Sequence, residues 1–114
     1  MIHQPTIVIR ESAQALLTDR IKAALDLLFV HLEQVARSQA VSLRAIEAYG
    51  FTDPEDDSQE LVVRETVGLE AEQALDYWDQ LSLAIEAWSS TLPSDIRDII
   101  RSQIAIEVIW EQDG

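Results

Sequence analysis

Two long segments with helical apolar periodicity, each flanked by shorter segments with the pattern of a β-strand, constrain the fold of this chain most strongly. The first helical segment spans 12–39, contains no Gly or Pro, and starts at Ser12, a common helix-capping residue type. The second spans 71–88 and follows Gly68. Their apolar stripes consist of Leu17, Ile21, Ala24, Leu28, Leu32 and Val35, and of Ala71, Ala74, Leu75, Trp78, Leu81, Ile85 and Trp88. We therefore expect two main helices.

A second apolar row in the first helical segment widens its stripe. Leu16, Leu25 and Phe29 form this row, beside the residues expected to face a sheet. One sheet face does not normally cover so broad a stripe. The row therefore predicts contact with a further element of the same chain or with a second subunit.

Four segments have the composition and alternation of strands: 6–10, 43–51, 59–67 and 104–110. The first is β-branched on both sides, so we expect a strand buried on both faces. A polar, turn-rich stretch at 52–58 predicts a hairpin between the second and third strands. Pro93 favours the start of a short helix that ends near Arg101.

The resulting order is β-α-β-β-α-β, with a short extra helix before the last strand. This order predicts an α+β fold of the ferredoxin-like (split β-α-β) type, with a four-stranded antiparallel sheet covered by helices on one face. The first and last strands would then be neighbours in the middle of the sheet. A chain of 114 residues fits a single domain, residues 1–114. Ferredoxin-like sheets serve many functions, so this fold alone predicts none.

Negative charge is concentrated in the middle of the chain. Between residues 45 and 96 there are thirteen carboxylates and one basic residue, Arg64, in a chain of net charge −13. Such a field repels nucleic acid and anionic lipid and attracts basic proteins or divalent cations. We therefore expect no nucleic-acid partner, no membrane partner and, if anything, a basic protein partner.

Several kinds of chemistry are excluded by composition. The chain has no Cys, so disulfides, thiolate metal sites and cysteine nucleophiles are ruled out. The longest apolar run, 27–30, is far below the roughly 18 residues of a membrane span. The first residues lack the basic region of a signal peptide. These features together favour a cytoplasmic protein.

The acidic hairpin loop is the first candidate site. Its carboxylates are Asp53, Glu55, Asp56, Asp57 and Glu60. Hard divalent cations take such oxygen ligands, but the alternating spacing, Gly and terminal Glu of an EF-hand loop are absent. We interpret the loop as a solvated hairpin tip and assign no metal ligand.

Two further candidates involve titratable groups on the helices. Asp76 and Asp79 lie three residues apart and could form a carboxylate pair, but with Tyr77 they fall on the expected outer side of their helix. His31 could act as a base or as one metal ligand, yet Gln34 and Val35 occupy the positions where a second ligand is expected. We interpret all four side chains as structural or surface groups.

The aromatic residues suggest stacking sites but have simpler explanations. Trp78, Trp88 and Trp110 could line a ligand pocket, but each lies on an apolar stripe, which favours the core. Tyr49 and Phe51 have the spacing of a base-stacking pair on a strand. This region also carries the strongest negative charge, which disfavours RNA.

The sequence therefore predicts a small, soluble, acidic interaction or regulatory module. We expect it to be a homodimer that uses a neutral surface on the long first helix or on the open sheet face, with a basic protein as a further partner. The alternative is an enzyme or small-ligand binder whose cleft lies between the open sheet face and the acidic hairpin. Asp76, Asp79 or His31 would act there between tryptophan walls. No catalytic, cofactor-binding or metal-binding residue is assigned, and no cofactor is expected.

Overall fold

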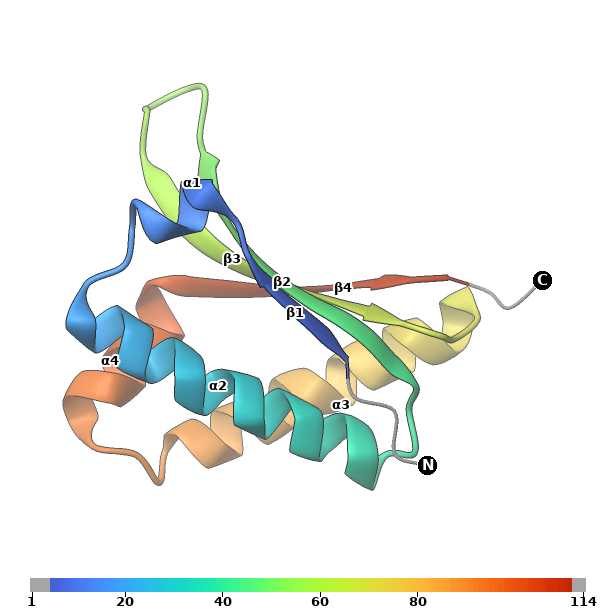
Figure 1. Cartoon of the computed structure of the whole chain (residues 1–114). Coiled ribbons are helices and arrows are strands. Elements are labelled where there is room, and N and C mark those ends of the chain that lie inside the picture. Colours follow the sequence, from blue (N-terminus) through green and yellow to red (C-terminus); the bar gives the residue numbers. More distant parts are fainter. Residues whose placement is uncertain (1–4, 112–114) are drawn as a thin grey trace.

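The computed structural model describes residues 5–111, so His3 lies outside the described part. The elements, in chain order, are β1 (Thr6–Ile9), α1 (Glu11–Gln14), α2 (Asp19–Ser38), β2 (Leu43–Thr52), β3 (Gln59–Val67), α3 (Ala71–Ser89), α4 (Ser94–Ser102) and β4 (Ile104–Trp110). The four predicted strands, the short helix and the helix at 71–88 are confirmed to within one or two residues. The architecture is α+β, with the helices packed on one face of the sheet (Figure 1).

The sheet topology differs from the ferredoxin-like prediction, which is wrong. The strand order is β1-β2-β3-β4, and β1 pairs with β2 in parallel, β2 with β3 antiparallel, and β3 with β4 in parallel. In a ferredoxin-like sheet each helical crossover skips one strand position, whereas here each crossover joins neighbouring strands. The chain thus forms two β-α-β units joined by the β2–β3 hairpin.

Strand length and burial explain why the hairpin occupies the centre. β2 and β3 are the longest strands, with 10 and 9 residues, while β1 has only 4. The expectation that the first strand is buried on both faces is wrong, because Ile7 and Val8 are 44% and 37% exposed. β1 and β4 are therefore the two edges of the sheet, not its middle.

The first helical segment is interrupted, in contrast to the single helix predicted for 12–39. α1 ends at Gln14 and α2 begins after Thr18, whose hydroxyl accepts a hydrogen bond from the Ile21 amide at 3.2 Å. Ser12 does not cap the long helix. Its hydroxyl instead accepts a hydrogen bond from the Gly50 amide of β2 at 2.9 Å. The break lets α1 dock on the sheet before α2 crosses it.

The second apolar row on this segment is covered within the chain. Leu25 is fully buried, Phe29 is 7% exposed, and Leu16, in the connection between α1 and α2, packs against the core. α2 contacts α3 and α4 as well as the sheet, which accounts for its broad stripe. The long helix therefore does not require a second subunit to bury this row.

The inward stripe of α3 is shifted from the predicted one. Ala74, Leu81 and Ile85 are in the core as expected, but Leu75 is 51% exposed and Tyr77 is only 3% exposed. Tyr77 lies three residues after Ala74 and four before Leu81, so it shares their face of the helix. The placement of Tyr77 on the outer side was therefore wrong.

The two faces of the sheet differ in cover. The covered face, beneath the helices, includes Ile46, Ala48, Val63, Glu65, Val67 and Val108, all of them buried. The opposite face, which we call the open face, carries Thr6, Val8, Ala45, Glu47, Tyr49, Phe51, Glu60, Val62, Arg64, Thr66, Ala105, Glu107 and Ile109. Figure 1 shows the sheet with all helices to one side. Among residues 5–111, no helix combines the length and apolar character that a membrane crossing requires.

Candidate functional site

The centre of the open face is a row of charged side chains held in register by the strands. Glu47 of β2, Arg64 of β3 and Glu107 of β4 are direct cross-strand partners. Arg64 pairs with Glu107 through Nε and lies 3.8 Å from Glu47 Oε1. Arg10, just after β1, completes the row by contacting Glu47 Oε2 through Nη2 at 2.7 Å. We call these four residues the charge ladder.

Tyr49 is tied into the charge ladder from the next position along β2. Its hydroxyl donates to Glu107 Oε1 at 2.8 Å and accepts from Arg64 Nη2 at 3.2 Å, and the guanidinium carbon lies 4.9 Å from the ring centroid. Burial, followed by the hydrogen bond to Glu107, raises the pKa of Tyr49. Each charged group of the ladder has an opposite partner, so the ladder offers no free base or nucleophile.

The covered face contains a polar pair that the sequence analysis did not single out. Glu65 is fully buried, and its Oε1 accepts a 2.7 Å hydrogen bond from the Tyr77 hydroxyl. Glu65 Oε2 is buried without a hydrogen-bond partner among the described residues. Burial raises the pKa of Glu65 to about 7, opposed by the Tyr77 hydrogen bond. The sequence did contain a signal for this burial, because Glu65 occupies an apolar position in the alternation of β3.

A pKa near neutrality is typical of a catalytic carboxyl, but geometry argues against this role for Glu65. Its side chain has no solvent-exposed surface and lies between the sheet and α3, where no substrate can reach it. The same burial raises the pKa of Tyr77, together with the neighbouring carboxylate. The pair is therefore a buried structural contact, and burial of the Glu65 carboxyl group lowers the stability of the fold.

His31 links the two main helices. Its ring stacks on Trp88 of α3 with the centroids 4.2 Å apart and the planes 9° from parallel. Burial lowers the pKa of His31, partly offset by a hydrogen bond with the Ala84 backbone. Asp76 precedes Trp88 by three turns of helix, about 18 Å along the axis. The structure therefore does not bring His31 and Asp76 together in a cleft.

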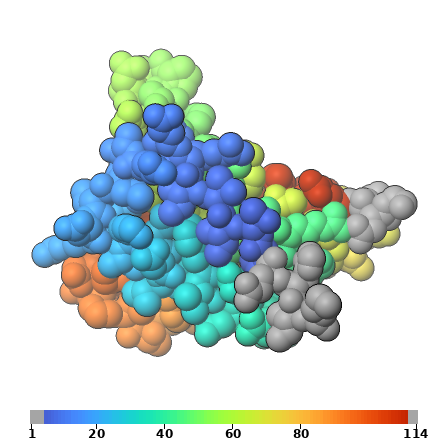
Figure 2. Space-filling model, in the orientation of Figure 1, coloured from blue at the N-terminus to red at the C-terminus, as the bar shows by residue number. Residues whose placement is uncertain are grey.

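The remaining carboxylate candidates are exposed. Asp76 and Asp79 lie on the solvent side of α3. In the acidic loop, the Oδ1 atoms of Asp53 and Asp56 accept the backbone amides of Glu55 and Ser58, so these carboxylates stabilise turns. Within residues 5–111, no three acidic or histidine side chains are grouped as ligands of a metal ion. Figure 2 shows the hairpin tip projecting from the body of the molecule.

The tryptophans do not form walls around a common site. Trp78 packs against the core, half-buried, and Trp88 stacks on His31. Trp110 is 37% exposed at the end of β4, so its predicted place in the core was wrong. Tyr49 is hydrogen-bonded to Glu107 and Arg64 of the charge ladder, and Phe51 is 47% exposed near the hairpin. The aromatic pair on β2 thus lies on the open face but shares it with acidic groups.

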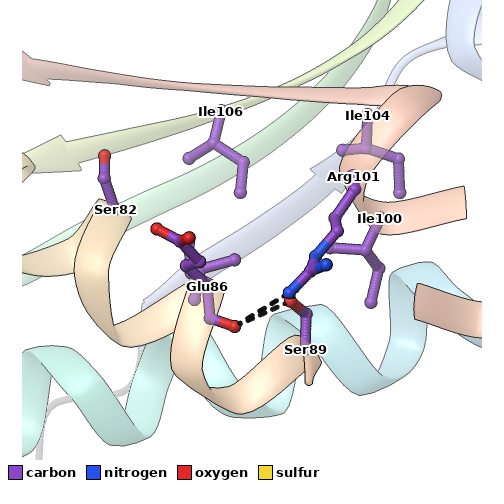
Figure 3. A pocket seen from close by; sticks show the side chains of 8 residues that line it. Ser82, Glu86, Ser89, Ile100, Arg101, Ile104 and Ile106 are labelled. Carbon is purple, nitrogen blue, oxygen red and sulfur yellow. Dashed lines mark hydrogen bonds between the residues drawn. The ribbon is translucent and has the colours of Figure 1, made fainter. Parts of the chain in front are cut away.

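A groove of about 420 Å³ opens between α3, α4 and β4, on the helix side of the sheet. Its floor is formed by Ile85, Ile100, Ile104 and Ile106, and its polar groups come from Ser82, Glu86, Ser89 and Arg101. Figure 3 shows the Glu86 carboxylate between Ser82 and Arg101, with the Arg101 guanidinium directed to Ser89. The groove could not be predicted from the sequence, because its residues come from three elements that only the fold brings together.

No family model, curated protein or solved structure matched this chain in the three comparisons.

Proposed function

We propose that this chain is a small interaction module that self-associates through the open face of its sheet, with a second copy as the occupant. The observation that carries the proposal is the internal neutralisation of this face. The charge ladder pairs two arginines with two glutamates, and among the other paired strand residues of the open face named above only Glu60 is charged. The face is thus nearly neutral in a chain of net charge −13.

Electrostatic repulsion favours this surface over the others. Most of the excess carboxylates lie in the hairpin loop and along the outer side of α3, away from the open face. Two acidic copies repel least when they approach through their neutral surfaces. Val8, Phe51 and Ile109 add exposed apolar area there, each more than a third exposed. The alternating charges of the ladder also allow one copy to complement another turned end for end.

The proposal predicts an unusual salt dependence. Added salt shortens the screening length from about 30 Å at 0.01 M to about 8 Å at 0.15 M, which weakens long-range repulsion between like-charged copies. Self-association through neutral faces should therefore become tighter as salt is added. Binding of a basic protein to the acidic surfaces should become weaker.

The test compares two single substitutions by sedimentation equilibrium. Ile109→Glu places a charge on the open face, and Leu83→Glu places the same charge on the outer side of α3, where Leu83 is 62% exposed. We expect Ile109→Glu to dissociate the dimer and Leu83→Glu to leave it intact, with both variants folded by circular dichroism. Dissociation by Leu83→Glu alone would assign the interface to the helices and overturn the proposal.

We place the protein in the cytoplasm and expect it to bind neither nucleic acid nor membrane surfaces. The absence of Cys and the net charge of −13 support this proposal. Retention of the protein on a heparin column at low salt, where an acidic chain should flow through, would contradict it.

A further inference from the structure

We propose that the groove between α3, α4 and the free edge of β4 binds the C-terminal segment of a partner protein, with an aliphatic last residue and basic residues before it. The groove lies on the helix side of the sheet, so this inference is independent of self-association through the open face. Three properties support this occupant: a free strand edge, an available guanidinium, and acidic side chains on α3, with Glu86 in the groove and further carboxylates toward the start of the helix.

The free strand edge provides backbone partners for an extended peptide. β4 pairs with β3 on one side, and within residues 5–111 no strand pairs with its other side. An edge strand presents unpaired amides and carbonyls to which a further strand can add. Ile104 and Ile106 of β4 direct their side chains into the groove beside this edge (Figure 3). An added strand would therefore place alternate side chains over an apolar floor.

Arg101 provides an anchor for a carboxylate. Its Nε donates to the Ser89 hydroxyl at 3.0 Å and its Nη2 donates to the Glu86 carbonyl at 3.4 Å, which fixes the guanidinium against the end of α3. These bonds use two of the five N–H donors and leave three available. Among the described residues, no carboxylate lies within ion-pair distance of Arg101. A pre-oriented guanidinium with free donors suits a terminal carboxylate, which it can bind with two hydrogen bonds.

The position of Arg101 sets the direction of the peptide. Arg101 precedes β4, so a carboxylate bound there requires the peptide to run antiparallel to the strand. The last side chain would then lie over Ile100 and Ile104, and the preceding residues would pass Ser82 and Glu86 toward the start of α3. That part of α3 carries Asp79 and Glu72 among its exposed residues, whereas Asp76 faces the end of α2 beside Gln39 and Val41. Basic residues upstream of the C-terminus complement this charge.

The test uses a fluorescent heptapeptide with lysines in its first half, alternating valine and threonine, and a C-terminal leucine. The control peptide is identical but ends in a carboxamide. We expect the free-acid peptide to bind about tenfold or more tightly than the amide, because only the carboxylate forms charged hydrogen bonds with Arg101. Equal binding of the two peptides to the unmodified protein would overturn the proposal, and this comparison does not depend on the folding of any variant.

Matched substitutions on α4 then assign the effect to Arg101. Arg101→Gln should abolish the preference for the free acid, whereas Arg97→Gln makes the same charge change outside the groove and should preserve it. Retention of the preference in Arg101→Gln would contradict the assignment. Binding of free leucine, without binding of the peptide, would identify a small-molecule site and also overturn the proposal.

Discussion

Replacement of Glu65 by Gln should stabilise the protein relative to the unmodified chain. The gain in the free energy of unfolding should be larger at neutral pH than at acidic pH. Gln has nearly the same size and retains an oxygen that can accept from Tyr77, so the core contacts are preserved. The substitution removes the ionisable group whose pKa is raised from 4.5 to about 7 by burial. When the unmodified protein folds, it must therefore either bury the charged carboxylate of Glu65 or keep this group protonated. The variant has neither cost.

The sign and the size of the effect follow from the difference in pKa. Between pH 4.5 and 7 the unfolded chain loses the Glu65 proton while the folded chain retains it, so the free energy of unfolding falls as pH rises. Each pH unit in this window changes it by about 1.4 kcal/mol. From pH 5 to pH 7 the loss is about 2 kcal/mol, and it levels off above about pH 8, where Glu65 is ionised in both states.

Urea unfolding monitored by tryptophan fluorescence from pH 5 to pH 8.5 measures this effect. The quantity of interest is the free energy of unfolding of Glu65→Gln minus that of the unmodified protein, which cancels contributions from other titrating groups. It should rise by about 2 kcal/mol between pH 5 and pH 7 and level off above about pH 8. Glu60→Gln, an exposed site on the same strand, serves as the control and should give a flat difference. A flat or falling difference for Glu65→Gln would refute the reasoning.

Two further predictions concern packing around the same sheet. Tyr77→Phe removes the hydroxyl that donates to Glu65 and should lower the free energy of unfolding by about 1–3 kcal/mol at pH 8. The loss should be smaller at pH 5, and equal stability of variant and parent at pH 8 would contradict it. Gly50→Ala would place a Cβ 2.6 Å from the Ser12 carbonyl oxygen and should cost about 1–3 kcal/mol. In Gly68→Ala the new Cβ meets only the end of a flexible side chain, so the loss in free energy of unfolding should be clearly smaller in the same urea assay. A larger loss for Gly68→Ala than for Gly50→Ala would show that α1 moves easily to accommodate the Cβ.

The elements of this fold could be predicted from local pattern, but their arrangement could not. The alternation in 59–67 and 104–110 gave correct strands because each strand buries one face against helices. Strand order depends on whether a crossover skips a position, and neither the order of elements nor the alternation encodes that choice. The exposure of Ile7 in a short edge strand shows the difficulty, since a β-branched run is equally compatible with a central strand.

The interruption of the first helical segment illustrates a second limit. Residues 15–18 contain no Gly or Pro, and the apolar period continues through Leu17. The signal was the pair Thr18-Asp19, a capping residue followed by an acidic one in the first turn. Ser12 offered a competing cap, and its contact with Gly50 of β2 could be seen only in the folded chain.

The candidate sites show what sequence spacing leaves out. The acidic loop was expected to be an exposed hairpin tip, and this is confirmed because residues 54–60 are exposed. The charge ladder combines Glu47, Arg64 and Glu107 from three strands with Arg10, which follows β1, and its pairing depends on a register that the predicted topology would not produce. Arg101 likewise became a candidate binding residue only because the fold places it beside the free edge of β4.

The most direct test of the central claim is the mass of the unmodified protein in solution. Light scattering coupled to size exclusion, over a dilution series at low and at physiological salt, reports both association and its salt dependence. We expect a dimer, with twice the mass of the chain, whose dissociation constant decreases as salt is added. A monomer at every concentration and salt, or a dimer that dissociates on addition of salt, would contradict association through the neutral open face.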